Sequence, residues 1–102
     1  MAFIAGPVPT EFERLLTATA AGYERDLRQA WPATERSADT LQFVVSDGAA
    51  TLHIAVAPAG VRRLGLFELP QLVARYRFTQ GDEPARRGLL LRLDRAMQKG
   101  GG

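Results

Sequence analysis

The side chains of this sequence that could do chemistry do not form a catalytic set. His53 is the only histidine. The nearest hydroxyl and carboxylate, Ser46 and Asp47, belong to a predicted hairpin tip several residues away along the strand. A nucleophile, its base and an orienting acid must lie within hydrogen-bond reach of one another. We therefore predict no catalytic residues, and an enzyme is the least favoured class.

Metal and cofactor sites have no supporting motif either. The sequence contains no cysteine, which excludes disulfides, thiolate catalysis and cysteine-ligated zinc or iron–sulfur sites. A transition metal would depend on one imidazole and scattered carboxylates. Gly100–Gly102 does not have the context of a phosphate-binding loop, because no strand precedes it and no helix follows. We expect neither a metal nor a cofactor.

The remaining candidates are arginines in the second half of the chain. Residues 1–60 carry four Arg against seven acidic residues, a charge of −3, whereas residues 61–102 carry eight Arg and one Lys against four acidic residues, a charge of +5. Arg63, Arg75 and Arg77 fall in predicted strands, and guanidinium groups suit bidentate binding of anions. The net charge of +2 is nevertheless weak for a nucleic-acid-binding protein.

A helix from Thr10 to Trp31 is the first element that we expect. Thr10 and Glu13 have the spacing of a capping box. Apolar residues then recur every three or four positions from Phe12 to Trp31, which predicts one apolar face. Pro32 ends the helix.

Four strands should follow. Alternating apolar residues on both sides of Asp47-Gly48 predict a hairpin in which Phe43 faces Leu52 and Leu41 faces Ile54. Residues 58–60 predict the next turn, and residues 68–70 predict a proline corner within the stretch Val61–Phe78. The residues expected on the core-facing side of this stretch are Leu64, Leu66, Leu72, Ala74, Tyr76 and Phe78.

The last element is a second helix, which begins near Pro84 and ends at Gly100. Its apolar stripe consists of Leu89, Leu90, Leu93 and Met97. Gly88 costs about 1 kcal/mol relative to alanine, which indicates either a close neighbour or a tolerated defect. We expect a single domain over residues 1–102, with an irregular arm at 1–9, whose Phe3 and Ile4 pack on the core, and a flexible tail at 98–102.

This order predicts an α+β fold, a two-layer sandwich. A four-stranded antiparallel meander carries the N-terminal and C-terminal helices on one face, in the order αββββα. The other face of the sheet is then uncovered.

The uncovered face is the predicted working surface. Arg63 is expected to lie opposite Arg75 or Arg77, and like charges facing each other destabilise a sheet. Something should therefore compensate for them. Phe67 and Val73 lie near these arginines, a composition typical of the centres of protein interfaces. The residues predicted to bind a protein or an anion are His53, Arg63, Phe67, Val73, Arg75 and Arg77.

We therefore expect a small non-enzymatic interaction domain that self-associates as a homodimer or binds a protein partner. The first alternative is binding of an anion or a nucleic acid through Arg63, Arg75 and Arg77. A single aromatic residue, Phe67, disfavours it, because sheet-based RNA binders stack bases on two or three. The second alternative is a ligand-binding or enzymatic pocket between helices and sheet. Tyr23, Trp31 and Tyr76 would be the residues to examine there, because each needs a polar partner if buried.

The N-terminal run MAFIAGPVP has no basic flank and no apolar segment of membrane-spanning length. We expect a soluble, cytoplasmic protein with no membrane partner.

Overall fold

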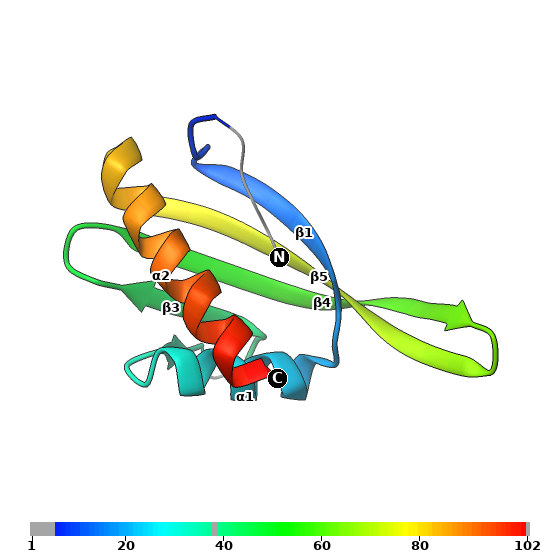
Figure 1. The fold of residues 1–102 in the computed structure, drawn as a ribbon. Coiled ribbons are helices and arrows are strands. Elements are labelled where there is room, and N and C mark those ends of the chain that lie inside the picture. Colours follow the sequence, from blue (N-terminus) through cyan, green and yellow to red (C-terminus); the bar gives the residue numbers. More distant parts are fainter. Residues whose placement is uncertain (1–5, 38, 102) are drawn as a thin grey trace.

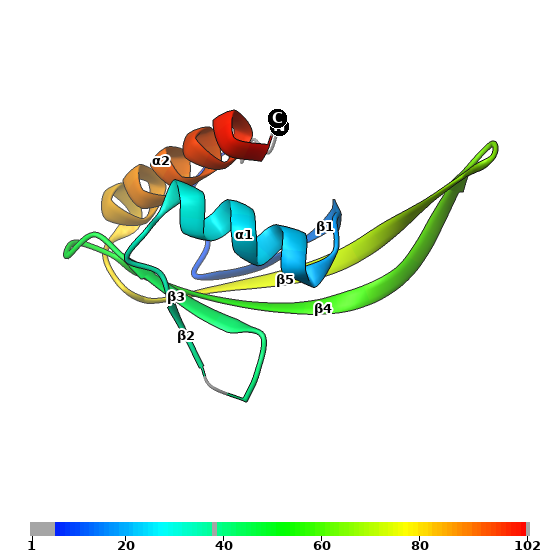
Figure 2. The same cartoon turned by 90° about the horizontal axis from the view of Figure 1, so that it is seen from below.

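The structure, a computed structural model, describes residues 6–37 and 39–101, and side chains as far as residue 98. Within these residues, the chain forms a five-stranded antiparallel sheet and two helices that lie on one face of it (Figures 1 and 2). The elements in chain order are β1 (Glu11–Thr17), α1 (Ala20–Ala30), β2 (Glu35–Arg36), β3 (Gln42–Ser46), β4 (Thr51–Leu64), β5 (Phe67–Gln80) and α2 (Glu83–Gly101).

The predicted α+β class is confirmed, with five strands in place of four. The sheet order is β1-β5-β4-β3-β2, so the β3-β4-β5 meander gains the N-terminal strand at one edge and the short β2 at the other. None of the helices in the described part of the chain is long and apolar enough to cross a membrane.

The N-terminal element differs from the prediction. Residues 11–17 form β1, and α1 begins only behind its N-cap Thr19, whose Oγ1 accepts a hydrogen bond from the Gly22 N–H at 3.0 Å. The predicted helix from Thr10 is therefore wrong in its first part. Phe12 and Leu16 are four residues apart, and this even spacing places them on one side of a strand as well as on one face of a helix.

The hairpin between β3 and β4 is present, with a longer loop than predicted. Asp47 Oδ1 accepts hydrogen bonds from the N–H groups of Ala49 and Ala50, both at 2.9 Å, and so closes a four-residue connection. As a result Phe43 faces Ile54, two positions further along β4 than predicted. Because side chains alternate with a period of two, this shift leaves the inner and outer sets unchanged.

The predicted turn at residues 58–60 and the corner at residues 68–70 are both wrong. β4 and β5 each run for 14 residues and are joined by a tight turn at Gly65-Leu66, where Gly65 has φ 59°. A positive φ at the first central residue of a two-residue hairpin favours glycine. Pro58 and Gly60 instead lie at a shift in the β4–β5 register, where β4 contains one extra residue.

Beyond the body, β4 and β5 continue as a two-stranded ribbon, residues 57–71, that projects away from the helices (Figures 1 and 2). The strands cross at its base in Figure 1, so the ribbon is strongly twisted relative to the body. The core positions predicted for Leu64 and Leu66 are wrong, since these residues are 46% and 101% exposed. The two helices cover the sheet only up to the base of the ribbon.

The core lies between the sheet and the helices. Leu72, Ala74, Tyr76 and Phe78 of β5 are buried as predicted. The opposite side of the core is supplied by Tyr23 and Leu27 of α1 and by Leu89, Leu90 and Leu93 of α2.

The N-terminal arm and the C-terminal helix differ in part from the prediction. Val8 of the N-terminal arm is buried, and its N–H donates to Glu83 Oε2 at 2.7 Å. Phe3 and Ile4, also predicted to pack on the core, lie outside the described residues. α2 runs to Gly101, beyond the end predicted at Gly100 and through part of the predicted tail. A Cβ at Gly88 would meet nothing within 4 Å, so this glycine is a tolerated defect.

Candidate functional site

The outer face of the sheet, on the side away from the helices, carries charges of both signs. The charged residues belong to two rows of cross-strand neighbours. The first row consists of Glu11, Arg77 and His53, and the second consists of Glu13, Arg75 and the uncharged Ala55. Arg75 Nε and Glu13 Oε2 form an ion pair at 2.8 Å. The compensation expected for the arginines is therefore provided for Arg75 by β1, which was predicted to be helical.

Arg63 does not share this face. It lies on the ribbon opposite Glu68, and the two form an ion pair of 3.4 Å. The expected position opposite Arg75 or Arg77 is wrong. The extra residue near Gly60 shifts the alternation of β4 by one, which turns Arg63 to the side of the ladder that carries the helices.

Apolar residues also occupy the outer face. Leu15 and Ala57 flank Val73 across the ladder, and Leu15 is 66% exposed. Val73 was predicted to lie on this face, whereas Leu15 was assigned to the apolar stripe of a helix. Assigning residues 11–17 to a strand would have placed Leu15 on the side opposite Phe12 and Leu16.

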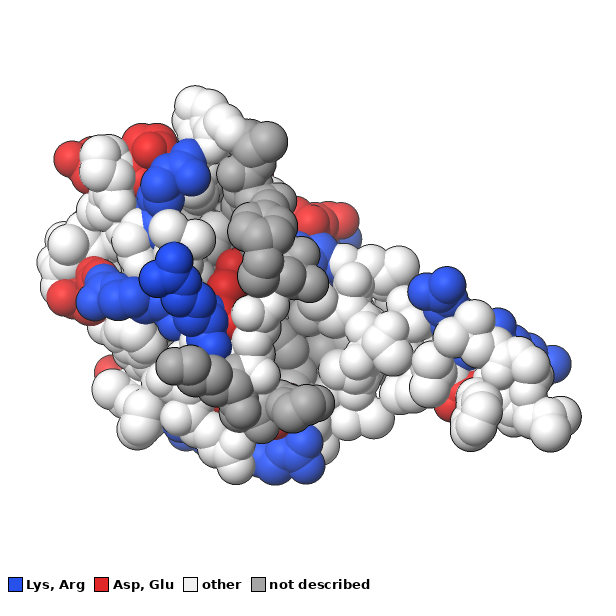
Figure 3. All heavy atoms as spheres, viewed as in Figure 1, with Lys and Arg blue, Asp and Glu red and all other residues white. Residues whose placement is uncertain are grey.

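The ribbon carries the two most exposed large apolar residues of the described chain, Leu66 and Phe67. Val61 is 59% exposed, Phe67 is 70% exposed and Leu66 at the turn is fully exposed. Leu64 pairs with Phe67 beside the turn. In the space-filling view, uncharged side chains form the near side of the ribbon's end, with basic side chains along its other edge and an acidic side chain between the uncharged ones (Figure 3). Of these residues, only Phe67 was predicted to be a binding residue.

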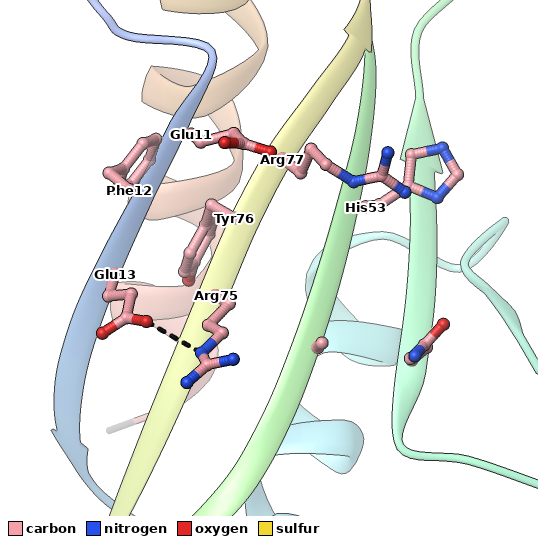
Figure 4. A pocket seen from close by; sticks show the side chains of 9 residues that line it. Glu11, Phe12, Glu13, His53, Arg75, Tyr76 and Arg77 are labelled. Atoms are coloured by element: carbon pink, nitrogen blue, oxygen red, sulfur yellow. Dashed lines mark ion pairs between the residues drawn. The ribbon is translucent and has the colours of Figure 1, made fainter.

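A hollow of about 410 Å³ opens on the outer face where the two charged rows meet. Its lining residues are Glu11, Phe12, Glu13, Gln42, His53, Ala55, Arg75, Tyr76 and Arg77. Figure 4 shows Arg77 reaching from β5 toward the His53 ring on β4. His53 lies opposite Val44, and its Nε2 is 3.1 Å from Thr79 Oγ1.

The hollow is lined mainly by charged and polar side chains. Thr79, whose hydroxyl lies beside His53, is not among the residues that line the hollow. Among the described residues, no group of three or more His, Cys, Asp or Glu side chains is arranged to hold a metal ion. Guanidinium and carboxylate groups at the rim suit charged partners.

A second polar cluster lies inside the fold. The hydroxyls of Tyr23 and Tyr76 are 2.9 Å apart, so each buried tyrosine supplies the partner that the other needs. Burial raises the pKa of both phenols. Beside them, the guanidinium of Arg14 lies 4.9 Å from the centre of the Tyr76 ring and pairs with Asp94. This cluster joins β1 to the helices, and we assign it a structural role.

Comparison of the chain with known protein families, with curated proteins and with solved structures found no match. The structure brings His53, Arg75 and Arg77 together at the hollow, with Val73 on the same face, and places Phe67 on the ribbon and Arg63 on the other side of the ladder. As binding residues, all six stay a prediction.

Proposed function

We propose that this protein is a non-enzymatic interaction domain that binds another protein chain through the ribbon and the outer face of the sheet. The observation that supports this proposal is the exposure of Val61, Leu66 and Phe67 on an element that no helix covers. A two-stranded hairpin is at best marginally stable alone in water, and exposed apolar clusters mark interaction sites. A partner chain would cover these side chains.

The composition of the surface supports a protein partner over a nucleic acid. Aromatic residues and arginine are enriched at the centres of protein interfaces. Phe67 and Arg62 lie on the same side of the ribbon, on its two neighbouring strands. A phosphate backbone instead favours a surface of uniform positive charge. Here Glu11 and Glu13 share the outer face with Arg75 and Arg77, and Glu68 pairs with Arg63.

A pocket between the helices and the sheet has less support than the outer face. The space there contains large side chains, and the hydroxyls of Tyr23 and Tyr76 bond to each other. We further propose a cytoplasmic location, which is compatible with the cysteine-free sequence.

Site-specific photo-crosslinking tests the proposal. A photoreactive phenylalanine analogue replaces Phe67 in the chain expressed in its native host. We expect covalent adducts with another protein chain after irradiation. The control carries the same analogue at Arg25, an exposed residue of α1 in the helix layer. The absence of protein adducts at Phe67, or equal adducts at both positions, would contradict the proposal.

A further inference from the structure

The ribbon ends in a protrusion without a polar side chain. Residues 64–67 are Leu-Gly-Leu-Phe, and they join β4 to β5 at the end of the ribbon that lies far from the helices (Figures 1 and 2). The side chains of Leu66 and Phe67 are exposed. The backbone of Leu64 pairs with that of Phe67 and closes the turn at Gly65, so the tip has a defined conformation. Such a tip fits a recess of matching size.

The same chain contains such a recess. A cavity of about 150 Å³ accepts a benzene-sized group, so the hollow of about 410 Å³ on the outer face has room for the side chains of Leu66 and Phe67. Ala55 and the aliphatic stems of Arg75 and Arg77 contribute apolar surface to its lining, whereas the rings of Phe12 and Tyr76 stack on the core side of the sheet. Arg77 at the hollow forms no ion pair with any other described residue. Its guanidinium is therefore available to stack on an aromatic ring.

The charges beside the tip and beside the hollow are complementary. Arg62 lies two residues before the tip and pairs with Leu69, and Glu11 lies at the rim of the hollow. Neither forms an ion pair within the described part of the chain. When the tip of one chain enters the hollow of another, the unpaired Arg62 comes near the unpaired Glu11. This attraction favours the contact over other contacts that bury the same apolar area.

From this match of size and charge, we propose that the partner of the ribbon is a second copy of this chain. The tip of one copy fills the outer-face hollow of another, with Phe67 against Arg77 and Arg62 against Glu11. This assignment rests on the proposed function and names its partner. Each copy offers one tip and one hollow, so the contact joins two different surfaces and not one surface to itself.

Directed disulfide formation tests the contact, because the chain has no cysteine of its own. One preparation carries Leu66→Cys and a second, with a tag of different mass, carries Ala55→Cys in the hollow. Mild oxidation of the mixture should give mainly the mixed disulfide. Leu66→Cys mixed with Arg25→Cys, on the helix layer, is the matched control and should give little. Equal yields in the two mixtures would overturn the proposal.

Solution mass provides the second measurement. We expect light scattering over a concentration series to show species above the monomer. Phe67→Glu should weaken self-association at least tenfold, whereas Leu91→Glu, at a 40% exposed leucine of α2, should not. Arg62→Glu should weaken association, and adding Glu11→Arg should restore it.

These measurements separate the failure of this inference from the failure of the proposed function. A wild-type chain that stays monomeric at every concentration overturns self-association. If Phe67 still crosslinks to a different protein, the interaction domain stands with another partner. Binding of the monomer to anionic vesicles that Phe67→Glu abolishes would also overturn the assignment of a second copy.

Discussion

Arg14 on β1 donates two hydrogen bonds to Asp94 on α2, from Nη1 to Oδ1 at 2.8 Å and from Nη2 to Oδ2 at 3.0 Å. Both side chains are mostly buried, with 13% and 16% of their surface exposed. This bidentate pair ties the edge strand of the sheet to the C-terminal helix. Burial opposes the charge of Arg14, but its hydrogen bond to Asp94 and its interactions with Tyr76 and Asp94 outweigh this effect and raise the pKa.

Removing one partner of this pair should be costly. We expect Asp94→Ala to lower the free energy of unfolding by about 2–4 kcal/mol, because it leaves a guanidinium without its carboxylate in a largely dry site. Glu13→Ala is the control, because the ion pair of Glu13 with Arg75 is exposed and is worth about 0.5 kcal/mol. Denaturant unfolding measures both, and equal losses would contradict the prediction.

Alkaline titration should report the buried tyrosine pair alone, because the chain has two tyrosines and both belong to it. Burial raises the pKa of Tyr23 and Tyr76, so the stability gained from the neutral pair is present below pH about 10 and is lost as pH rises through the folded pKa. We expect tyrosinate absorbance to appear together with loss of the circular dichroism of the fold. Ionisation near pH 10 with the fold intact would refute this.

Acid should loosen two loop contacts. Hydrogen bonding from the Val8 N–H and then from Arg87 lowers the pKa of Glu83. Burial opposes ionisation of Asp47, but the N–H groups of Ala50 and Ala49 and the neighbouring Arg92 outweigh it and lower the pKa. Both contributions to stability are present above pH about 4 and are lost as pH falls through the lowered values.

The unfolding midpoint in denaturant should therefore fall steeply below pH about 4. The variants Glu83→Gln and Asp47→Asn should each make this fall shallower, and the double variant should combine the two effects. If both single variants follow the wild-type pH profile, these carboxylates do not stabilise the fold.

Two glycines should respond in opposite directions to alanine. Gly88 lies inside α2 with nothing within 4 Å of a Cβ, so Gly88→Ala should stabilise the protein by about 0.5–1 kcal/mol. Gly81 has φ 110°, and a Cβ there would lie 2.8 Å from that of Ala50. Gly81→Ala should therefore destabilise the fold. Thermal unfolding of the pair checks both signs, and a loss of stability in Gly88→Ala would count against the open space at that position.

The ribbon should contribute little to the stability of the body. Phe67→Ala removes a side chain that is 70% exposed, so the unfolding free energy should change by at most about 0.5 kcal/mol. Phe43→Ala removes a fully buried ring and should cost about 3–5 kcal/mol. Measured under conditions where the chain is monomeric, a large loss in Phe67→Ala would show that the ribbon packs on the body.

Part of the outer face could be predicted from alternation alone. His53, Val73, Arg75 and Arg77 lie on the side of the ladder where the sequence placed them. Arg63 does not, because one extra residue in β4 reverses its side, and no periodic pattern shows where an extra residue will be accommodated. Glu11 and Glu13 were missed because their segment was assigned to a helix.

The sequence by itself determined the α+β class, the core residues of β5 and the apolar stripe of α2, because periodicity reports which side of an element is apolar. It could not determine whether Phe12 and Leu16 belong to a helix or a strand, since both geometries place them together. Only the tertiary structure decided that β1 completes the sheet and that the helices stop short of Leu64 and Leu66. Alternation shows which way a side chain points, and the length and position of other elements decide whether anything covers it.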